Sequence, residues 1–172
     1  MTDRFLKGSA KLMQKMNTSL ILQIIQERGP ISRTELAKLT NLSHPAVSAL
    51  LAPLLEDGIV KEVGTAASTG GRPPRLLQFN AKAGFLIGVD VGWTTMAGAV
   101  VDLAGNILHR ENRASAMGER SIAILIELID SLIQLSDMPP AGLRGIGLGI
   151  PGVTDSKGQK VSHAPGVGWE SL

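Results

Sequence analysis

The sequence contains no cysteine and no tyrosine, and aromatic residues make up only 3% of its 172 residues. The absence of cysteine excludes disulfide bonds, thiolate zinc sites and a cysteine nucleophile, and it suits a reducing compartment. No apolar run approaches the ~18 residues that a membrane-spanning helix requires, and the N-terminus lacks the apolar core of a signal peptide. We therefore expect a soluble, cytoplasmic protein of one or two small domains, without a metal site.

The formal net charge of +2 conceals an uneven distribution. Residues 1–84 contain eleven Lys or Arg against six Asp or Glu, a balance of +5, whereas residues 85–172 contain six against nine, a balance of −3. A basic first half joined to an acidic second half suggests that nucleic acid contacts the first half alone. A solvated surface would explain the +5 equally well, so the charge has weight only together with the motif described next.

Residues 31–79 have the pattern of a winged helix-turn-helix. Ser32 can cap a short helix, and Glu35 completes a capping box. Ser43 can cap a second helix, which has proline in its first turn and apolar residues along one face until Gly58 ends it. Two extended segments joined by a loop rich in Gly, Ser and Thr then predict a β-hairpin wing.

The flanking segments set the limits of this first domain. An apolar stripe after Asn17 predicts a helix that stops at Gly29-Pro30, the first helix of a three-helix core. Pro53 lies inside the second helix of the motif and would cost about 3 kcal/mol in a straight one, so we expect a kink or support from apolar packing. The expected segments are a mobile basic arm (1–16), the winged helix-turn-helix (17–80), a linker (81–84) and a second domain (85–172).

The second helix of such a motif enters the major groove, where its first turn reads base edges. Its outward hydroxyls and imidazole can bond bases or phosphates, although none is the Arg or Asn that reads bases most sharply. The start of the preceding helix offers phosphate contacts, and the Gly-Arg-Pro tripeptide of the wing suits a minor groove. The alternatives are a merely exposed His44, a wing Arg72 that pairs with Glu62, and a winged helix that binds no DNA. The expected DNA-binding residues are Arg33, Thr34, Ser43, His44, Ser48, Arg72 and Arg75.

The second half predicts a partial α/β domain. A single helix is expected there, and one helix cannot cover both faces of a sheet. The expected elements are strands over 85–91, 94–102, 107–114 and 143–150, a helix over 119–136, and a hairpin around 156–158.

A phosphate-loop-like turn lies between the first two of these strands and contains Asp90, Gly92, Thr94 and Thr95. A carboxylate, a glycine turn and hydroxyls can hold a metal ion and nucleotide phosphates, because the backbone N–H groups of the turn cradle oxygen atoms. Turns of the form Asp-x-Gly are common, so this pattern alone is a weak signal.

Over nearly its whole length the sequence resembles the ROK family, which groups sugar-responsive repressors with sugar kinases. The branch that includes xylose repressors is the most similar. The resemblance implies an α+β chain with an N-terminal winged helix-turn-helix followed by a partial actin-like (ribonuclease H-like) α/β domain. The matching stretches are 12–17, 32–37, 43–48, 70–74, 85–105, 145–152 and 164–169.

Two departures from the family pattern concern activity. Family kinases have Gly-Gly-Thr-Lys after the Asp-x-Gly start, whereas this chain has Gly92-Trp93-Thr94-Thr95 and no lysine. Gly166 stands where the family has a sugar-contacting asparagine. The resemblance also places the family's catalytic Asp, its further sugar-binding residues and its zinc site beyond residue 172. We therefore expect a chain cut short within its effector domain, with no catalytic residue and no cofactor.

These observations predict a sequence-specific DNA-binding transcriptional regulator, a repressor of carbohydrate-utilisation genes such as those for xylose, and not an enzyme. Its expected partners are a double-stranded DNA operator, a second copy in a homodimer, and a sugar effector that this chain binds weakly or not at all; no membrane is expected. Two alternatives stay open. One is a ROK-type sugar kinase with a DNA-binding extension, and the other is a DNA-binding module whose remaining half-domain only dimerises.

Overall fold

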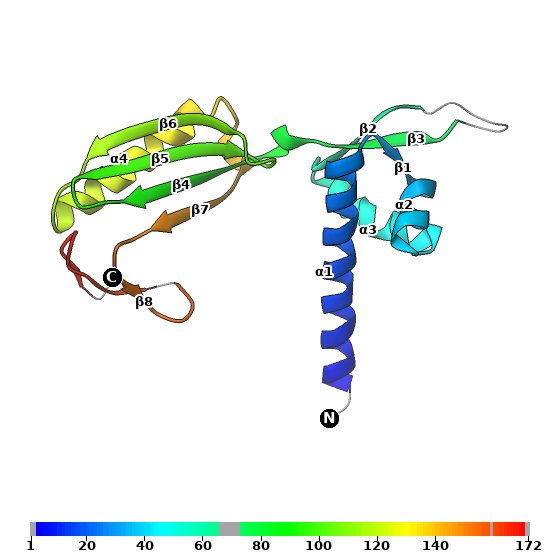
Figure 1. Ribbon diagram of the computed structural model, residues 1–172, viewed down its shortest axis with the longest axis horizontal. Helices are drawn as coiled ribbons and strands as arrows, with labels where there is room; N and C mark the ends of the chain where they lie inside the picture. Colours follow the sequence, from blue (N-terminus) through cyan, green and yellow to red (C-terminus); the bar gives the residue numbers. More distant parts are fainter. Residues whose placement is uncertain (1–2, 66–72, 159, 171–172) are drawn as a thin grey trace. The chain divides into compact units, whose positions relative to one another are not determined.

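The computed structural model describes residues 3–65, 73–158 and 160–170, and the chain divides into two compact units, residues 1–83 and 84–172 (Figure 1). Each unit has a hydrophobic core of its own. Among the helices in these ranges, none is both long and apolar enough to cross a bilayer.

The first unit is a three-helix core with a small antiparallel sheet in the strand order β1-β3-β2. Its buried side chains come from all three helices and all three strands, so the apolar stripes predicted from the sequence meet in one cluster. The elements are α1 (Asp3–Arg28), β1 (Ile31–Ser32), α2 (Arg33–Thr40), α3 (His44–Glu56), β2 (Val60–Thr65) and β3 (Arg75–Phe79).

Local capping fixes the two helices of the motif as the sequence predicts. The Ser32 hydroxyl accepts a hydrogen bond from the Glu35 N–H (3.2 Å), and the Ser43 hydroxyl accepts one from the Ala46 N–H (3.3 Å). Asn41 adopts the left-handed conformation (φ 55°) that ends α2. α3 continues through Pro53, and four of its apolar side chains are buried, so apolar packing supports the helix at this proline: Val47, Leu50, Leu51 and Leu54.

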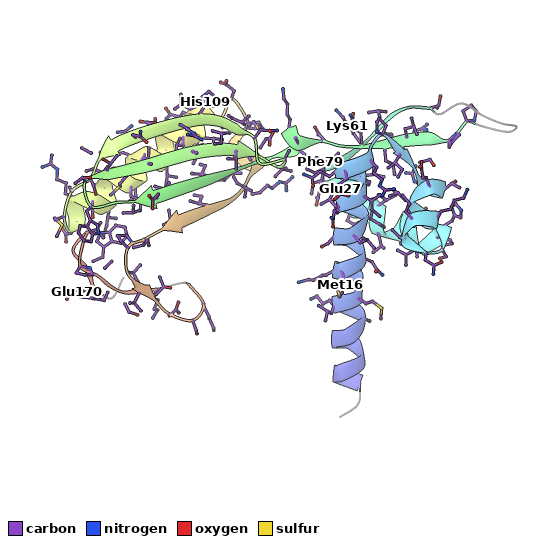
Figure 2. All side chains as sticks on the ribbon, viewed as in Figure 1. Met16, Glu27, Lys61, Phe79, His109 and Glu170 are labelled. Atoms are coloured by element: carbon purple, nitrogen blue, oxygen red, sulfur yellow. The ribbon has the colours of Figure 1, made fainter. Side chains whose placement is uncertain are left out.

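The predicted mobile arm over residues 1–16 is wrong, because α1 already begins at Asp3. The cap expected around Asn17 does not form. The Thr18 hydroxyl instead donates to the carbonyl of Gln14 within the helix (2.9 Å), a bond that lets a hydroxyl residue sit in a helix interior. Figure 2 shows Met16 on the part of α1 that extends beyond the packed core, where its side chain is exposed.

The second unit is a four-stranded sheet in the order β6-β5-β4-β7, with one helix and a small three-stranded sheet beside it. β4 is antiparallel to β5 and parallel to β7, and β5 is antiparallel to β6, as Figure 1 shows. The elements are β4 (Phe85–Val91), β5 (Thr95–Asp102), β6 (Ile107–Ala114), α4 (Glu119–Leu135), β7 (Leu143–Gly149), β8 (Val153–Thr154), β9 (Val161–Ala164) and β10 (Trp169–Glu170).

α4 packs on one face of the larger sheet, and the opposite face is open. Residues of β4 alternate strictly between buried and exposed, which is the period-2 pattern of a sheet covered on one side. Leu128 and Leu132 of α4 are fully buried, and a Cβ at Gly98 of β5 would lie 2.5 Å from the Leu132 side chain. Glycine at this position therefore allows the helix to approach the strand closely.

The β5–β6 hairpin closes around the carboxylate of Asp102, which is buried. Its Oδ1 accepts hydrogen bonds from the N–H groups of Ala104 and Asn106 (both 2.9 Å), and its Oδ2 accepts one from the Asn106 side chain (2.9 Å). Burial alone would raise the pKa of Asp102, but these hydrogen bonds outweigh it and hold the pKa below the usual value. The sequence predicted this turn but not the role of the carboxylate.

Candidate nucleic-acid interface

The N-terminal end of α3 presents polar side chains to solvent. Ser43, His44 and Ser48 are all exposed, while Val47 on the opposite side of the helix is fully buried. This division follows from helical periodicity, because residues three or four apart share a face and Val47 anchors the inner one. The outward face of α3 therefore carries two hydroxyls and one imidazole, the set that the sequence assigned to base contact.

The first residues of α2 lie beside the wing strands. Thr34 is exposed, and Nη2 of Arg33 donates to Oε1 of Glu62 on β2 (2.8 Å). Nη1 of Arg75, on β3, donates to Oε2 of the same carboxylate. Both guanidinium groups and the carboxylate remain in contact with solvent. Three elements of the first unit thus bring two of the predicted DNA-binding arginines to a single glutamate.

The sequence suggests Glu62 only as a partner of Arg72, which lies outside the described residues. In the structure Glu62 binds Arg33 and Arg75. Hydrogen bonds from Arg75 and then Arg33 hold the pKa of Glu62 below its usual value, so this carboxylate is charged at neutral pH. The missed signal was strand register: Glu62 pairs with Leu77, which makes Arg75 its diagonal neighbour across the hairpin.

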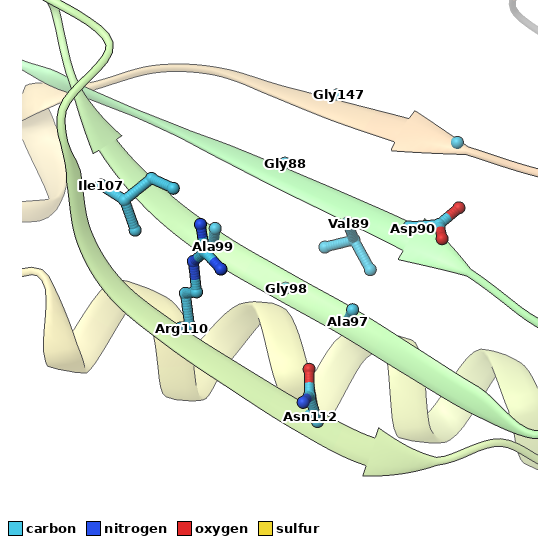
Figure 3. A pocket seen from close by; sticks show the side chains of 11 residues that line it. Gly88, Val89, Asp90, Ala97, Gly98, Ala99, Ile107, Arg110, Asn112 and Gly147 are labelled. Carbon is cyan, nitrogen blue, oxygen red and sulfur yellow. The ribbon is translucent and has the colours of Figure 1, made fainter.

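In the second unit, the open face of the larger sheet contains a shallow depression of about 530 Å³. Two rows of residues cross the strands there, and their floor consists of glycine and alanine (Figure 3). Asp90 stands at one side of this floor, and Arg110 and Asn112 stand at the other. Within the described residues no cluster of His, Asp and Glu has the arrangement of a metal site.

The predicted phosphate-loop-like turn forms a tight reversal between β4 and β5. The N–H of Gly92 donates to the carbonyl of Thr95 (3.0 Å), and a Cβ at Gly92 would lie 2.6 Å from that oxygen, so only glycine fits. Asp90, Thr94 and Thr95 are exposed at or beside the turn. The structure thus places all four predicted residues in one strand–turn–strand segment, and Asp90 also borders the depression on the open face.

Trp93 and Gly166, the residues at the two departures from the family pattern, lie in contact. A Cβ at Gly166 would lie 2.1 Å from Nε1 of Trp93, so the indole occupies the space that a side chain at position 166 would need. Trp93 is 70% exposed, in contrast to Trp169, which is buried and donates from Nε1 to the Ser121 hydroxyl (2.6 Å). The absence of a side chain at position 166 therefore leaves room for the indole of Trp93.

Comparisons with known proteins agree with this architecture. A winged helix-turn-helix DNA-binding model matches residues 17–61, and the ROK family model matches residues 86–172. A winged helix-turn-helix joined to a partial actin-like domain defines the class of the chain. The chain belongs to the ROK family.

Among curated proteins, the chain is 37% identical over 162 residues to a xylose repressor of Bacillus spizizenii, covering 93% of this chain and 42% of that protein. It is 28% identical over 164 residues to the DNA-binding transcriptional dual regulator NagC of Escherichia coli, covering 93% and 40%. A solved ROK family transcriptional regulator, a homologue of the E. coli MLC protein, matches with a TM-score of 0.74 at 21% identity, covering 93% and 41%. The chain spans about two fifths of the length of these relatives.

Proposed function

We propose that this chain is a sequence-specific DNA-binding repressor of carbohydrate-utilisation genes, and that its first unit makes the DNA contacts. The observation that carries the proposal is the exposed polar N-terminal end of α3 on a closed winged helix-turn-helix core. Ser43, His44 and Ser48 would face base edges, and Arg33 and Thr34 at the start of α2 would face phosphates. Relatives named xylose repressor and N-acetylglucosamine repressor support the choice of regulated genes.

The other DNA-binding assignments belong to the wing. Arg72 would enter a minor groove and Arg75 would contact the flanking backbone, contributing affinity that depends little on sequence. We further propose that the protein acts in the cytoplasm as a homodimer. Helix-turn-helix dimers bind operators whose two half-sites are related by the same two-fold symmetry as the protein. A sugar would be its effector.

Catalysis is not part of the proposal. A sugar kinase needs groups that align the substrate hydroxyl with the γ-phosphate and stabilise its charge, since positioning and electrostatics supply most of the rate. The turn at Gly92 carries Trp93 and no lysine, and Trp93 covers the position where the family has its sugar-contacting asparagine. The kinase alternative rests on Asp90 and its turn, and sugar-dependent ADP release that is lost in Asp90→Ala would favour it.

Fluorescence anisotropy tests the proposal directly. One labelled duplex spans the region upstream of the gene for this chain, and a second has the same composition in shuffled order. Neutralisation of about five phosphates predicts a log–log salt slope of about −4 to −5 on both, with tighter binding to the first. Arg72→Ala should weaken both duplexes and flatten the slope by about 1. Failure of the wild-type chain to bind any duplex would overturn the proposal.

A further inference from the structure

Glu62 is the one acidic side chain that α2 and the wing strands direct at the proposed phosphate-binding arginines, among the described residues. Backbone pairing fixes this geometry: β3 lies between β1 and β2, Ser32 pairs with Leu76 on one side, and Glu62 pairs with Leu77 on the other. Arg33 directly follows β1, and Arg75 begins β3. The same three-stranded sheet therefore brings both guanidinium groups to the carboxylate.

The contact with Glu62 lowers the net positive charge that Arg33 and Arg75 present to DNA. Arg33 and Arg75 contribute two positive charges, and the charged carboxylate of Glu62 reduces their sum to one. A guanidinium has five N–H donors, so one carboxylate oxygen cannot satisfy it, and each arginine can bind a phosphate while it stays on Glu62. The side chains are 32%, 61% and 27% exposed for Arg33, Arg75 and Glu62, so a backbone phosphate can reach them.

We propose that Glu62 is a specificity-determining residue that weakens binding to random DNA more than binding to the operator. Non-specific affinity comes almost entirely from phosphate charge, so a carboxylate among the phosphate contacts lowers it on every sequence. On the operator, base contacts from α3 fix the register, and arginines already held in one orientation lose less conformational freedom on binding. This inference rests on the proposed DNA-binding function, to which it adds a residue whose negative charge opposes phosphate binding.

Glu62→Gln separates the two effects, because the amide keeps the shape and one acceptor oxygen but removes the charge. At about 0.1 M salt we expect the affinity for the shuffled duplex to rise about three- to tenfold and its salt slope to steepen by about 1. Affinity for the upstream duplex should rise less, so the ratio between the two duplexes should fall. Adding Arg75→Gln to Glu62→Gln restores the net charge and should return the shuffled-duplex affinity towards the wild-type value.

Glu56→Gln is the matched control. Glu56 is exposed at the last residue of α3, about 18 Å along the helix from its first turn, and its replacement changes the net charge equally. We expect less than a twofold change on either duplex. Circular dichroism at 222 nm should show the same melting for all variants, since exposed ion pairs contribute little to stability.

The outcomes distinguish this inference from the proposed function. A wild-type chain that binds no duplex defeats the proposed function itself. A wild-type chain that binds DNA, with Glu62→Gln equal to Glu56→Gln or weaker than wild type on the shuffled duplex, overturns the role of Glu62 alone.

Discussion

The two units of this chain differ in how completely they cover their apolar surface. In the first unit, three helices and three strands enclose one core. In the second, α4 covers one face of the larger sheet, while Leu86 and Ile107 on the open face are 39% and 47% exposed. Ile146 and Leu148 of β7, beside α4, are each 44% exposed. The first unit also exposes apolar side chains, among them Met13 and Met16 of α1 (58% and 63%), but the outward start of its α3 is polar. The second unit exposes apolar side chains on its larger sheet.

This difference agrees with the proposal that the first unit binds DNA and that the second contacts protein. Polar side chains on a rigid helix suit a groove of DNA, whereas contiguous exposed apolar groups mark contacts with other protein surface. It also supplies separate reporters. Both tryptophans, Trp93 and Trp169, lie in the second unit, so tryptophan fluorescence reports on that unit alone. DNA binding would report on the first unit, to which we assign the DNA contacts.

The largest expected effect comes from truncating a side chain in the core of the first unit, which should destabilise that unit alone. Leu51→Ala removes a fully buried side chain from the first core and should lower the free energy of unfolding by about 2–5 kcal/mol. Circular dichroism at 222 nm should show the loss, while the tryptophan unfolding curve stays unchanged. Leu39→Ala, at a leucine that is 44% exposed, is the control and should cost far less. A matching shift in tryptophan fluorescence would show that the units unfold together.

The next largest loss of stability is expected from replacing the buried carboxylate of the second unit. Asp102→Asn loses acceptors for the hairpin and should cost about 1–3 kcal/mol at pH 7, measured by tryptophan fluorescence in urea. Because the folded pKa lies below the usual 3.8, the stabilisation is present above that value and is lost as the pH falls through the lowered pKa. The difference between wild type and variant should therefore shrink on acidification below pH 3.8. Asp130→Asn, on the exposed side of α4, is the charge-matched control and should cost far less at pH 7.

The contact between Trp93 and Gly166 predicts a coupled effect within the second unit. Gly166→Ala forces the indole to move and should cost about 1–3 kcal/mol, with a change in the fluorescence of Trp93. In a Trp93→Gly background the same alanine should cost less than about 0.5 kcal/mol, read from urea denaturation with Trp169 as the probe. Equal costs in both backgrounds would show that the two positions are independent. DNA binding should stay the same throughout.

The smallest effect concerns the outward face of α3. Ser48→Ala should weaken the upstream duplex by about 0.5–1.5 kcal/mol, the range of one hydrogen bond, and leave the shuffled duplex nearly unchanged. Anisotropy titrations on both duplexes measure the difference, with Ser19→Ala on the exposed side of α1 as the control. Equal weakening on both duplexes would move Ser48 from base reading to general affinity.

Features set by neighbouring residues could be predicted from the sequence, and features set by distant contacts could not. Ser32 and Ser43 predict the starts of their helices because a cap depends only on the next three residues. The sequence misplaces the start of α1 because the Thr18 hydroxyl donates to a carbonyl inside the helix. Cap chemistry alone does not distinguish this bond from a cap. The pairing of Glu62 depends on strand register, and the contact of Trp93 with Gly166 joins residues far apart in the chain. None of these long-range relations has a local signature.

Amide hydrogen exchange with and without the upstream duplex tests the central claim, that DNA contacts the first unit alone. We expect slower exchange in peptides that contain the starts of α2 and α3, at 32–35 and 43–48, and unchanged exchange across 85–170. Protection of the β4–β5 turn or of the open face around Arg110 would contradict it, as would the absence of protection in the first unit while the duplex is bound.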